Sequence, residues 1–189
     1  MPPLKTVFLK SLLRKEIARA LSKLKPSSRR KKSLRIAQKL MRTAGFQKAR
    51  NIMAYMPLPR EVDTRPVLAK LLAMGKNIFL PALDRAKGEI RIFRVTNLRR
   101  DLMPGNYGIL EPRPARCAAG RPSGLDLILV PGVGFDKKGG RLGHGKGYFD
   151  KFLRKAKRAE KIGLAFREQL LKKVPLEKHD QRVDRVITD

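Results

Sequence analysis

A glycine-rich segment over residues 131–150 combines the residue types that bind phosphate groups. It holds seven glycines between positions 132 and 147, and Arg141 and Lys146 add two positive side chains. An apolar stretch typical of a buried strand precedes the segment, and a helix is expected to follow it. Glycines let backbone amides approach phosphate oxygens, and a helix N-terminus adds its positive end. The pattern predicts an anion site at the carboxyl end of a strand; the alternative is a flexible loop that binds nothing.

Neither of two standard phosphate motifs fits this segment. Gly140 and the Gly145-Lys146 pair have the spacing of a P-loop, but Gly147 stands where Ser or Thr would hold magnesium. The alternating glycines of the same stretch lack the G-x-G-x-x-G spacing of a dinucleotide site. Asp150 follows at the start of the expected helix. It either carries magnesium between the protein and a phosphate or complements the helix dipole, and spacing alone leaves both open.

The pattern of apolar residues predicts the elements that position this segment. Three- and four-residue steps predict helices over residues 4–24 and from about residue 27 to Gly45, both with basic outer faces. Further helices are expected around residues 64–75 and 148–158. Short apolar runs predict strands over residues 51–56, 77–80, 88–95, 125–130, 161–165 and 186–188, with Pro81 ending the second. Residues 101–124, rich in Pro and Gly, are expected to form an ordered surface loop.

The order of these elements predicts an α/β fold. A strand, a helix and a second strand over residues 51–80 form a βαβ unit, whose parallel strands need helices on both faces. A chain of 189 residues is long enough for one domain with its own core. We therefore expect one Rossmann-like three-layer α/β domain over residues 1–189. It has a mostly parallel sheet and an N-terminal helical arm over about residues 1–45.

The chain is strongly basic. Lys and Arg number 45 against 16 Asp and Glu, which gives a formal net charge of +29. Either a solvated basic face or a nucleic-acid-binding surface accounts for this charge. Aromatic residues make up 6% with no Trp, which counts against stacking on single-stranded bases. The single Cys117 excludes an internal disulfide and a four-ligand Cys/His zinc site, and no apolar run reaches the ~20 residues that cross a membrane.

The glycine-rich segment resembles the signature of the 5-formyltetrahydrofolate cyclo-ligase family, also called methenyltetrahydrofolate synthetases, in Pro131–Asp136 and Gly140–Asp150. Further segments resemble the family in its own order along nearly the whole chain: Lys10–Arg14, Tyr55–Pro57, Glu61–Thr64, Val174-Pro175, His179-Asp180 and Val186–Thr188. The resemblance implies an enzyme that uses ATP, with Mg²⁺, to convert 5-formyltetrahydrofolate to 5,10-methenyltetrahydrofolate, ADP and phosphate. In that reaction the formyl oxygen takes the γ-phosphoryl group, and nitrogen 10 attacks the activated carbon.

The resemblance also implies roles for individual residues. Lys10, Arg14, Arg141 and Lys146 would act on the phosphates during catalysis. Two stretches would bind ATP: Lys10, Ser11, Leu12, Leu13 and Arg14 in the first helix, and Arg141, Leu142, Gly143, His144, Gly145, Lys146, Gly147, Tyr148 and Phe149 in the glycine-rich segment. The folate would contact Met56, Glu61, His144, Gly145, Lys146, Gly147 and Tyr148. Asp150 and Asp180 would contact magnesium directly or through water.

These roles have structural alternatives. The alternatives are a solvated helix face for Lys10 and Arg14, plain core for Met56, a surface pair with Arg60 for Glu61, and an ordinary turn for His179-Asp180. Many relatives carry Arg where this chain has His144, and a second Tyr where it has Phe149. A histidine with an ordinary pKa of ~6.5 is mostly neutral at pH 7, so neighbouring Lys146 or the basic arm would have to compensate. Lys32 is expected on an outer helix face.

Two other functions stay open at this stage. One is a basic nucleic-acid-binding protein, and the other is a nucleotide-binding relative without cyclo-ligase turnover. For the enzyme, we expect a cytoplasmic monomer without membrane contact. The charge exceeds what ATP and one folate need, which favours folates with a polyglutamate tail, because each added glutamate adds an anion.

Overall fold

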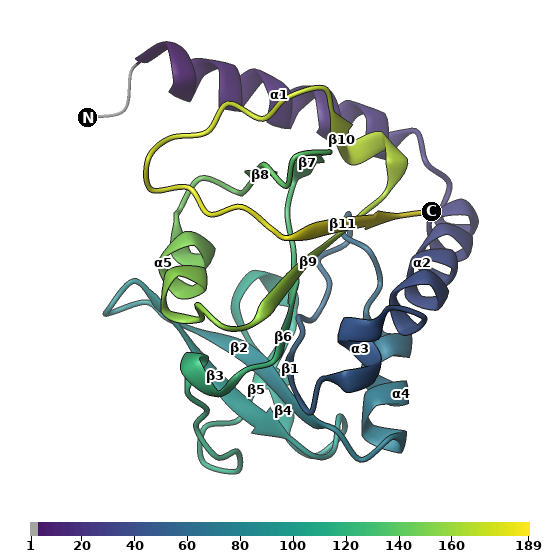
Figure 1. The fold of residues 1–189 in the computed structure, drawn as a ribbon, viewed down its shortest axis with the longest axis vertical. Helices are drawn as coiled ribbons and strands as arrows, with labels where there is room; N and C mark the ends of the chain where they lie inside the picture. The colour runs from purple at the N-terminus through teal and green to yellow at the C-terminus, as the bar shows by residue number, and fades with distance from the viewer. Residues whose placement is uncertain (1–3) are drawn as a thin grey trace.

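The computed structural model describes residues 4–189, which build a central six-stranded sheet with helices on both faces (Figure 1). The strand order is β11-β9-β6-β1-β2-β3. All neighbouring pairs are parallel except β2 and β3, which leaves one antiparallel strand at an edge. The bounds are β1 Asn51–Met53, β2 Asn77–Asp84, β3 Glu89–Val95, β6 Leu127–Val130, β9 Glu160–Ala165 and β11 Arg185–Thr188. The predicted α/β fold with a mostly parallel sheet is confirmed.

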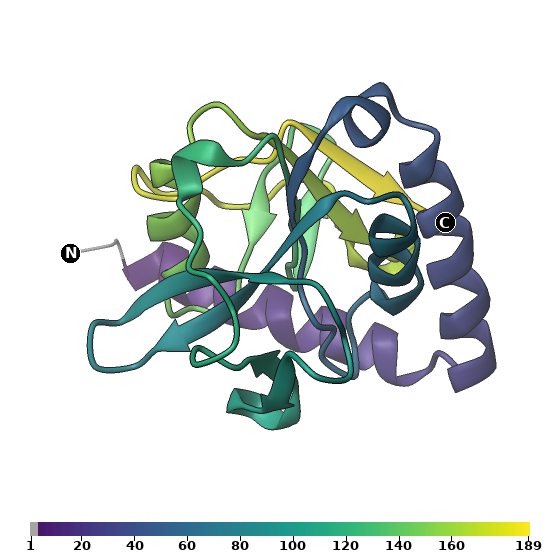
Figure 2. The same cartoon turned by 90° about the horizontal axis from the view of Figure 1, so that it is seen from below.

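The helices form the two outer layers. α2 (Pro26–Met41), α3 (Ala44–Lys48) and α4 (Arg65–Ala73) lie on one face of the sheet, and α5 (Tyr148–Lys155) lies on the other (Figure 1). α1 (Leu4–Ser22) crosses one end of the molecule, as both views show (Figures 1 and 2). Within residues 4–189, no helix combines the length and the apolar character that a membrane crossing requires.

The N-terminal helices are part of the domain. α2 buries Ile36, Ala37 and Leu40 in the main core, and α1 adds Ile17 and Leu21 to it. Ile17 and Leu21 in α1, and Ala37 and Leu40 in α2, belong to the helical spacing from which both helices were predicted. The prediction that Gly45 ends the second helix was wrong. α2 ends at Met41, and Gly45 lies inside the short helix α3.

Short strands occupy stretches in which the sequence predicted no strand. β7 (Gly134–Asp136), β8 (Arg141–Leu142) and β10 (Leu170–Leu171) form a three-stranded sheet in the order β10-β7-β8. β4 (Leu102–Pro104) and β5 (Leu110–Pro112) form an antiparallel pair. The prediction of a loop over residues 101–124 was therefore wrong. Three single 3₁₀ turns complete the chain, at Asn106–Gly108, Pro122–Gly124 and Arg167–Gln169.

The sequence predicted that Pro81 ends the second strand, but β2 continues past it to Asp84. The reason is the direction in which the backbone nitrogen of Pro81 points. The carbonyl of Phe79 accepts a hydrogen bond from the N–H of Ala54, so the backbone N–H and C=O groups of Phe79 point toward the chain of β1. The backbone groups of residues two apart in a strand point to the same side, so the backbone nitrogen of Pro81 also points toward the β1 side. The pairing of β1 with β2 ends at Met53 and Phe79. The missing N–H of Pro81 therefore costs no ladder bond, and β2 continues to Asp84 along β3.

The strand order creates a place where two connections diverge. From β1 the chain passes through α4 to β2 on one side, and from β6 it passes through the glycine-rich segment and α5 to β9 on the other. Loops that leave neighbouring strands in opposite directions open a crevice at the carboxyl ends of those strands, where open α/β sheets bind ligands. The topology therefore places a binding site beside the ends of β1 and β6.

A buried aromatic ring seats the glycine-rich segment on the sheet. Phe135 of β7 is fully buried. A Cβ atom at either Gly132 or Gly163 would lie 2.6 Å from a ring carbon of Phe135. Only glycine allows the ring to approach both backbones so closely, and this contact fixes the segment above β9.

Gly163→Ala should lower the free energy of unfolding by about 2 kcal/mol, because the new methyl group overlaps a ring that has no room to move. Gly124→Ala is the matched control: nothing lies within 4 Å of its Cβ position, and we expect a change within about 0.5 kcal/mol. Denaturant titration followed by circular dichroism measures both. Equal stability of the two variants would contradict the packing described for Phe135.

Candidate functional site

A cavity of about 550 Å³ lies at the divergence of the two connections. It lies among α1, the loop after β1, the β2–β3 pair, the glycine-rich segment and the segment before β11. Most of the predicted site residues line it: Lys10, Arg14, Met56, Glu61, Arg141, Leu142, Gly143, His144, Gly145, Lys146, Gly147, Tyr148, Phe149, Asp150 and Asp180. Ser11, Leu12 and Leu13 do not: the first two are exposed, and Leu13 packs against the core.

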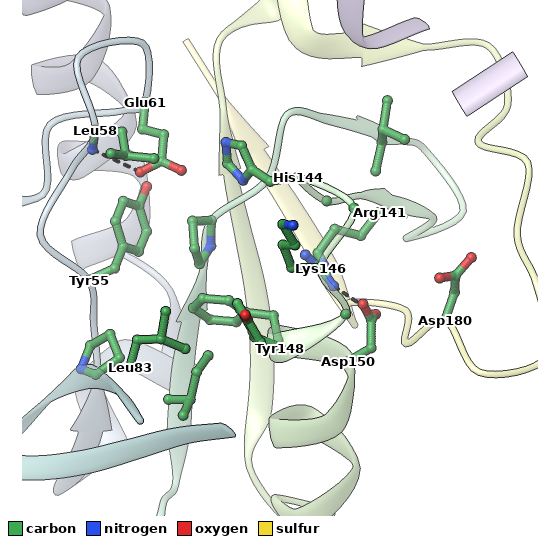
Figure 3. A pocket seen from close by; sticks show the side chains of 18 of the residues that line it. Tyr55, Leu58, Glu61, Leu83, Arg141, His144, Lys146, Tyr148, Asp150 and Asp180 are labelled. Atoms are coloured by element: carbon green, nitrogen blue, oxygen red, sulfur yellow. Dashed lines mark hydrogen bonds and ion pairs between the residues drawn. The ribbon is translucent and has the colours of Figure 1, made fainter. Parts of the chain in front are cut away.

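The cavity has one apolar and one charged side. Figure 3 shows Tyr55, Leu58 and Leu83 on one side and Arg141, Asp150 and Asp180 on the other, with His144 and Lys146 between them. Ile90, Ile109 and Leu110 add to the apolar lining. Such a cavity can take a ligand that is flat and apolar at one end and anionic at the other.

Lys10 brings α1 to the charged side. Its Nζ donates to Glu177 Oε2 at 2.9 Å and to Asp180 Oδ2 at 2.6 Å. Burial alone would lower the pKa of Lys10, but the hydrogen bonds to Asp180 and Glu177 more than offset burial and raise it. Lys10 is therefore a fixed, buried cation and not part of a solvated helix face.

Arg14, one turn further along α1, holds the glycine-rich loop. Its Nε donates to the carbonyl oxygen of Gly143 at 2.8 Å. Gly145 and Gly147 have φ angles of +95° and +68°, a region that favours glycine. These conformations turn the loop tightly at the start of α5, next to the Arg14 guanidinium.

Arg141 is the most buried cation of the site, with 3% of its side chain exposed. Its Nη2 donates to Asp150 Oδ1 at 2.7 Å, and its guanidinium lies 5.8 Å from the ring centroid of Phe149. The backbone N–H of Gln181 donates to the same Asp150 oxygen at 3.0 Å. Asp150 therefore orients Arg141 and ties the C-terminal segment to α5.

Glu61 is a carboxyl group on the apolar side of the cavity. Its Oε2 accepts a hydrogen bond from the N–H of Leu58 at 3.0 Å. Burial raises the pKa of Glu61 to about 7, against a smaller opposite effect of the Leu58 N–H. A surface pair with Arg60 is therefore not what holds Glu61, which points into the cavity beside Tyr55 (Figure 3).

Glu177, His179 and Asp180 form a small cluster at the charged side. Each offers a ligand atom, and these atoms lie within 4.8 Å of one another. Glu177 Oε1 is buried and has no hydrogen-bond partner among residues 4–189. Glu177 was not predicted from the sequence, where its only signal is its place three residues before Asp180.

Asp136 holds the glycine-rich segment from below. Its carboxylate accepts hydrogen bonds from the N–H groups of Lys138, Gly140 and Val174 at 2.8, 2.9 and 2.8 Å. Burial alone would raise the pKa of Asp136, but these three donors and the nearby Arg182 hold it below its ordinary value. The loop that carries Arg141 is thus fixed by one ionised carboxylate.

The fold and the site together define an α/β protein whose cavity has a cationic side, suited to a phosphate chain, next to an apolar side. The profile of the 5-formyltetrahydrofolate cyclo-ligase family matches residues 8–189, and the chain belongs to this family.

Curated relatives and solved structures agree. The chain is similar to the 5-formyltetrahydrofolate cyclo-ligases of Mus musculus, at 32% identity over 93% of this chain and 91% of the relative, and of Saccharomyces cerevisiae, at 31% identity over 94% of each. The structure of Aquifex aeolicus 5,10-methenyltetrahydrofolate synthetase superposes with a TM-score of 0.84 at 34% identity, over 95% of this chain and 89% of that one.

Asp136→Asn should lower the free energy of unfolding by about 2 kcal/mol at pH 7, because an amide cannot accept from all three donors. An acid whose pKa is lowered by folding stabilises above its unfolded pKa, ~3.9, and loses this effect as the pH falls through the lower folded value. The difference between the two proteins should therefore stay constant from pH 7 to 5 and shrink below about 4. Urea titrations measure it, with exposed Glu16→Gln as the control. A pH-independent difference would contradict an ionised Asp136.

Proposed function

We propose that this protein converts 5-formyltetrahydrofolate to 5,10-methenyltetrahydrofolate, with ATP consumed to ADP and phosphate. One observation carries the proposal: a single cavity joins an apolar side with Glu61 to a charged side with Lys10, Arg14, Arg141 and Lys146. A pterin ring fits the first side, and the phosphate chain of ATP fits the second. The two reactants would meet at the loop between them, which carries His144 and Lys146.

The reaction needs positioning and charge more than a protein nucleophile. The formyl oxygen of the substrate attacks the γ-phosphorus, and the bond to ADP breaks. Nitrogen 10 then attacks the activated formyl carbon and loses its proton, and phosphate leaves with the formyl oxygen. Lys146 and Arg141 would stabilise the negative charge that develops on the transferred group. Lys10 and Arg14 would hold the remaining phosphates.

The charged side suits a magnesium ion. Hard divalent cations prefer carboxylate oxygens, and Glu177 Oε1 is a buried oxygen without a partner in the described chain. Glu177 and Asp180 would hold the ion, with Asp150 nearby, although one oxygen of Asp150 is already committed to Arg141. When bound, magnesium would neutralise charge on the phosphates.

Three further expectations belong to this proposal. The net charge of +29 favours folates with polyglutamate tails, whose carboxylates add anions. The protein would act as a monomer. It would work in the cytoplasm, where a reducing environment suits its single buried thiol, Cys117.

Purified protein mixed with 5-formyltetrahydrofolate, ATP and magnesium should produce the near-ultraviolet absorbance of the methenyl product, and only when ATP is present. Binding of ATP without this absorbance would instead favour a nucleotide-binding relative without turnover. Tight, salt-sensitive binding to RNA together with no turnover would favour the nucleic-acid alternative.

Lys146→Ala should lower kcat/KM about a hundredfold, because it removes a positive charge aimed at the transferred group. Lys32 was expected on an outer face but pairs with Glu168 and Asp189, both at 2.8 Å, so it is a poor control. Exposed Lys31 in the same helix is a better one, and Lys31→Ala should stay within about twofold of the parent. Equal losses of kcat/KM in the two variants would contradict the assignment of the glycine-rich loop as the phosphate site.

Glu61 predicts a pH dependence of folate binding. If its carboxylate accepts N–H groups of the pterin, the ionised form binds, and a pKa of about 7 makes kcat/KM for the folate rise with pH up to about 7 and then level off. Below that value the rise approaches about tenfold per pH unit. Measured at saturating ATP, Glu61→Gln should lower kcat/KM and abolish this inflection. A variant that keeps the inflection would show that another group causes it.

A further inference from the structure

The two residues next to His144 in the chain, Gly143 and Gly145, each lie against a guanidinium group, and the two groups come from different elements. Arg14 of α1 donates to the Gly143 carbonyl, and its Nη2 lies 3.4 Å from the Cβ position of Gly145. Arg141 of β8 has its Nη1 3.0 Å from the position that a Cβ atom would take at Gly143. Gly143 and Gly145 therefore each contact a positively charged guanidinium. The imidazole of His144 between them lines the cavity and points into it (Figure 3).

The groups around His144 leave this region positive. The titratable and charged groups that line the same cavity are Lys10 and Arg14 on α1, Tyr55 and Glu61 after β1, Glu111 on β5, Arg141 and Lys146 in the glycine-rich segment, Tyr148 and Asp150 on α5, and Glu177, His179 and Asp180 before β11. Three of the acids are already engaged, Asp150 by Arg141 and both Glu177 and Asp180 by Lys10. Arg14 and Lys146 form no ion pair within residues 4–189.

This surplus of positive charge acts on the imidazole. Desolvation in the cavity lowers the pKa of His144, and the charges of Arg141 and Arg14 lower it further. These effects favour the neutral ring in the free protein. A polyphosphate would bring several negative charges to the same place, and would offer oxygens to which an imidazolium donates strongly.

We propose that His144 gains a proton when a polyphosphate binds, so that the ring is neutral in the free protein and a cationic phosphate ligand in the complex. The inference rests on the proposed function, because it needs the phosphate chain of ATP in this cavity. It deepens that proposal by making nucleotide binding proton-coupled: His144 supplies a positive charge only once the anion is present.

The sign of the pH effect follows from this linkage. At low pH the ring is protonated in both states, and at high pH it is neutral in both, so neither limit shows proton uptake. Between the two midpoints each binding event takes up a proton, and affinity falls as the pH rises. Each unit by which the midpoint rises on binding corresponds to about tenfold in affinity between the two limits.

The chain has only two histidines, so NMR can follow His144 directly. The probe is a non-hydrolysable ATP analogue with magnesium, added to the full chain without folate, and His179→Gln assigns the second ring signal. The midpoint of His144 should lie below ~6.5 in the free protein and about one unit or more higher in the complex. If the analogue binds and the midpoint does not rise, the inference is wrong and the nucleotide site stands.

Calorimetry in buffers of different ionisation enthalpy gives a second measurement. His144→Gln should lose the extra proton uptake of the parent and bind the analogue at least about threefold more weakly at pH 6, with little difference at pH 8.5. Protons that the analogue itself exchanges are common to both proteins and cancel in the comparison. Identical proton uptake by parent and variant would overturn the inference, whereas no binding of the analogue to the parent would overturn the nucleotide site of the proposed function and the inference with it.

Discussion

The site requires several like charges to stay close together before any ligand arrives. Lys10, Arg14, Arg141 and Lys146 all line one cavity, and a charge taken out of water costs several kcal/mol unless a partner compensates it. The protein meets this constraint mainly with carboxylates. Asp150 compensates the nearly buried Arg141, and the pair of Glu177 and Asp180 compensates Lys10. Each of these contacts also joins separate parts of the chain. The ion pairs that compensate the charges of the site therefore also hold the fold together.

The distances along the chain show how strongly the site depends on the complete fold. Lys10 and Asp180 are 170 positions apart, and Arg14 and Gly143 are 129 apart. Neither contact forms until α1 lies across the end of the sheet where β1 and β6 send their loops in opposite directions. Once formed, the contacts hold the cations in fixed directions, so that a phosphate chain meets groups that need little rearrangement. Preorganised charge of this kind is what phosphoryl transfer asks of a protein.

The parts of the fold and site that the sequence predicted are those with a local pattern. The helical spacing of Ile17 and Leu21 and the apolar run before Pro131 are local, and the glycine-rich segment was found from its composition alone. Glu177 was missed because its role comes from Lys10, far away in the chain. β7, β8 and β10 were missed because strands of two or three residues have no period to read and exist only through pairing. Pro81 was wrongly predicted to end its strand, because the cost of its missing N–H depends on whether a neighbouring strand pairs with it, and β1 ends before that point.

Glu61 and His144 show how the two sides of the cavity differ. Burial raises the pKa of Glu61 and thereby favours its neutral form, while desolvation and two arginines favour the neutral form of His144. The free cavity thus carries less charge of either sign than its residue types suggest. The fixed charge that remains, on Lys10, Arg14, Arg141 and Lys146, is four of 45 basic residues. Most of the basic residues behind the net charge of +29 therefore lie outside the cavity. The excess can act at most over longer range, where salt screens it, by drawing anionic substrates toward the molecule.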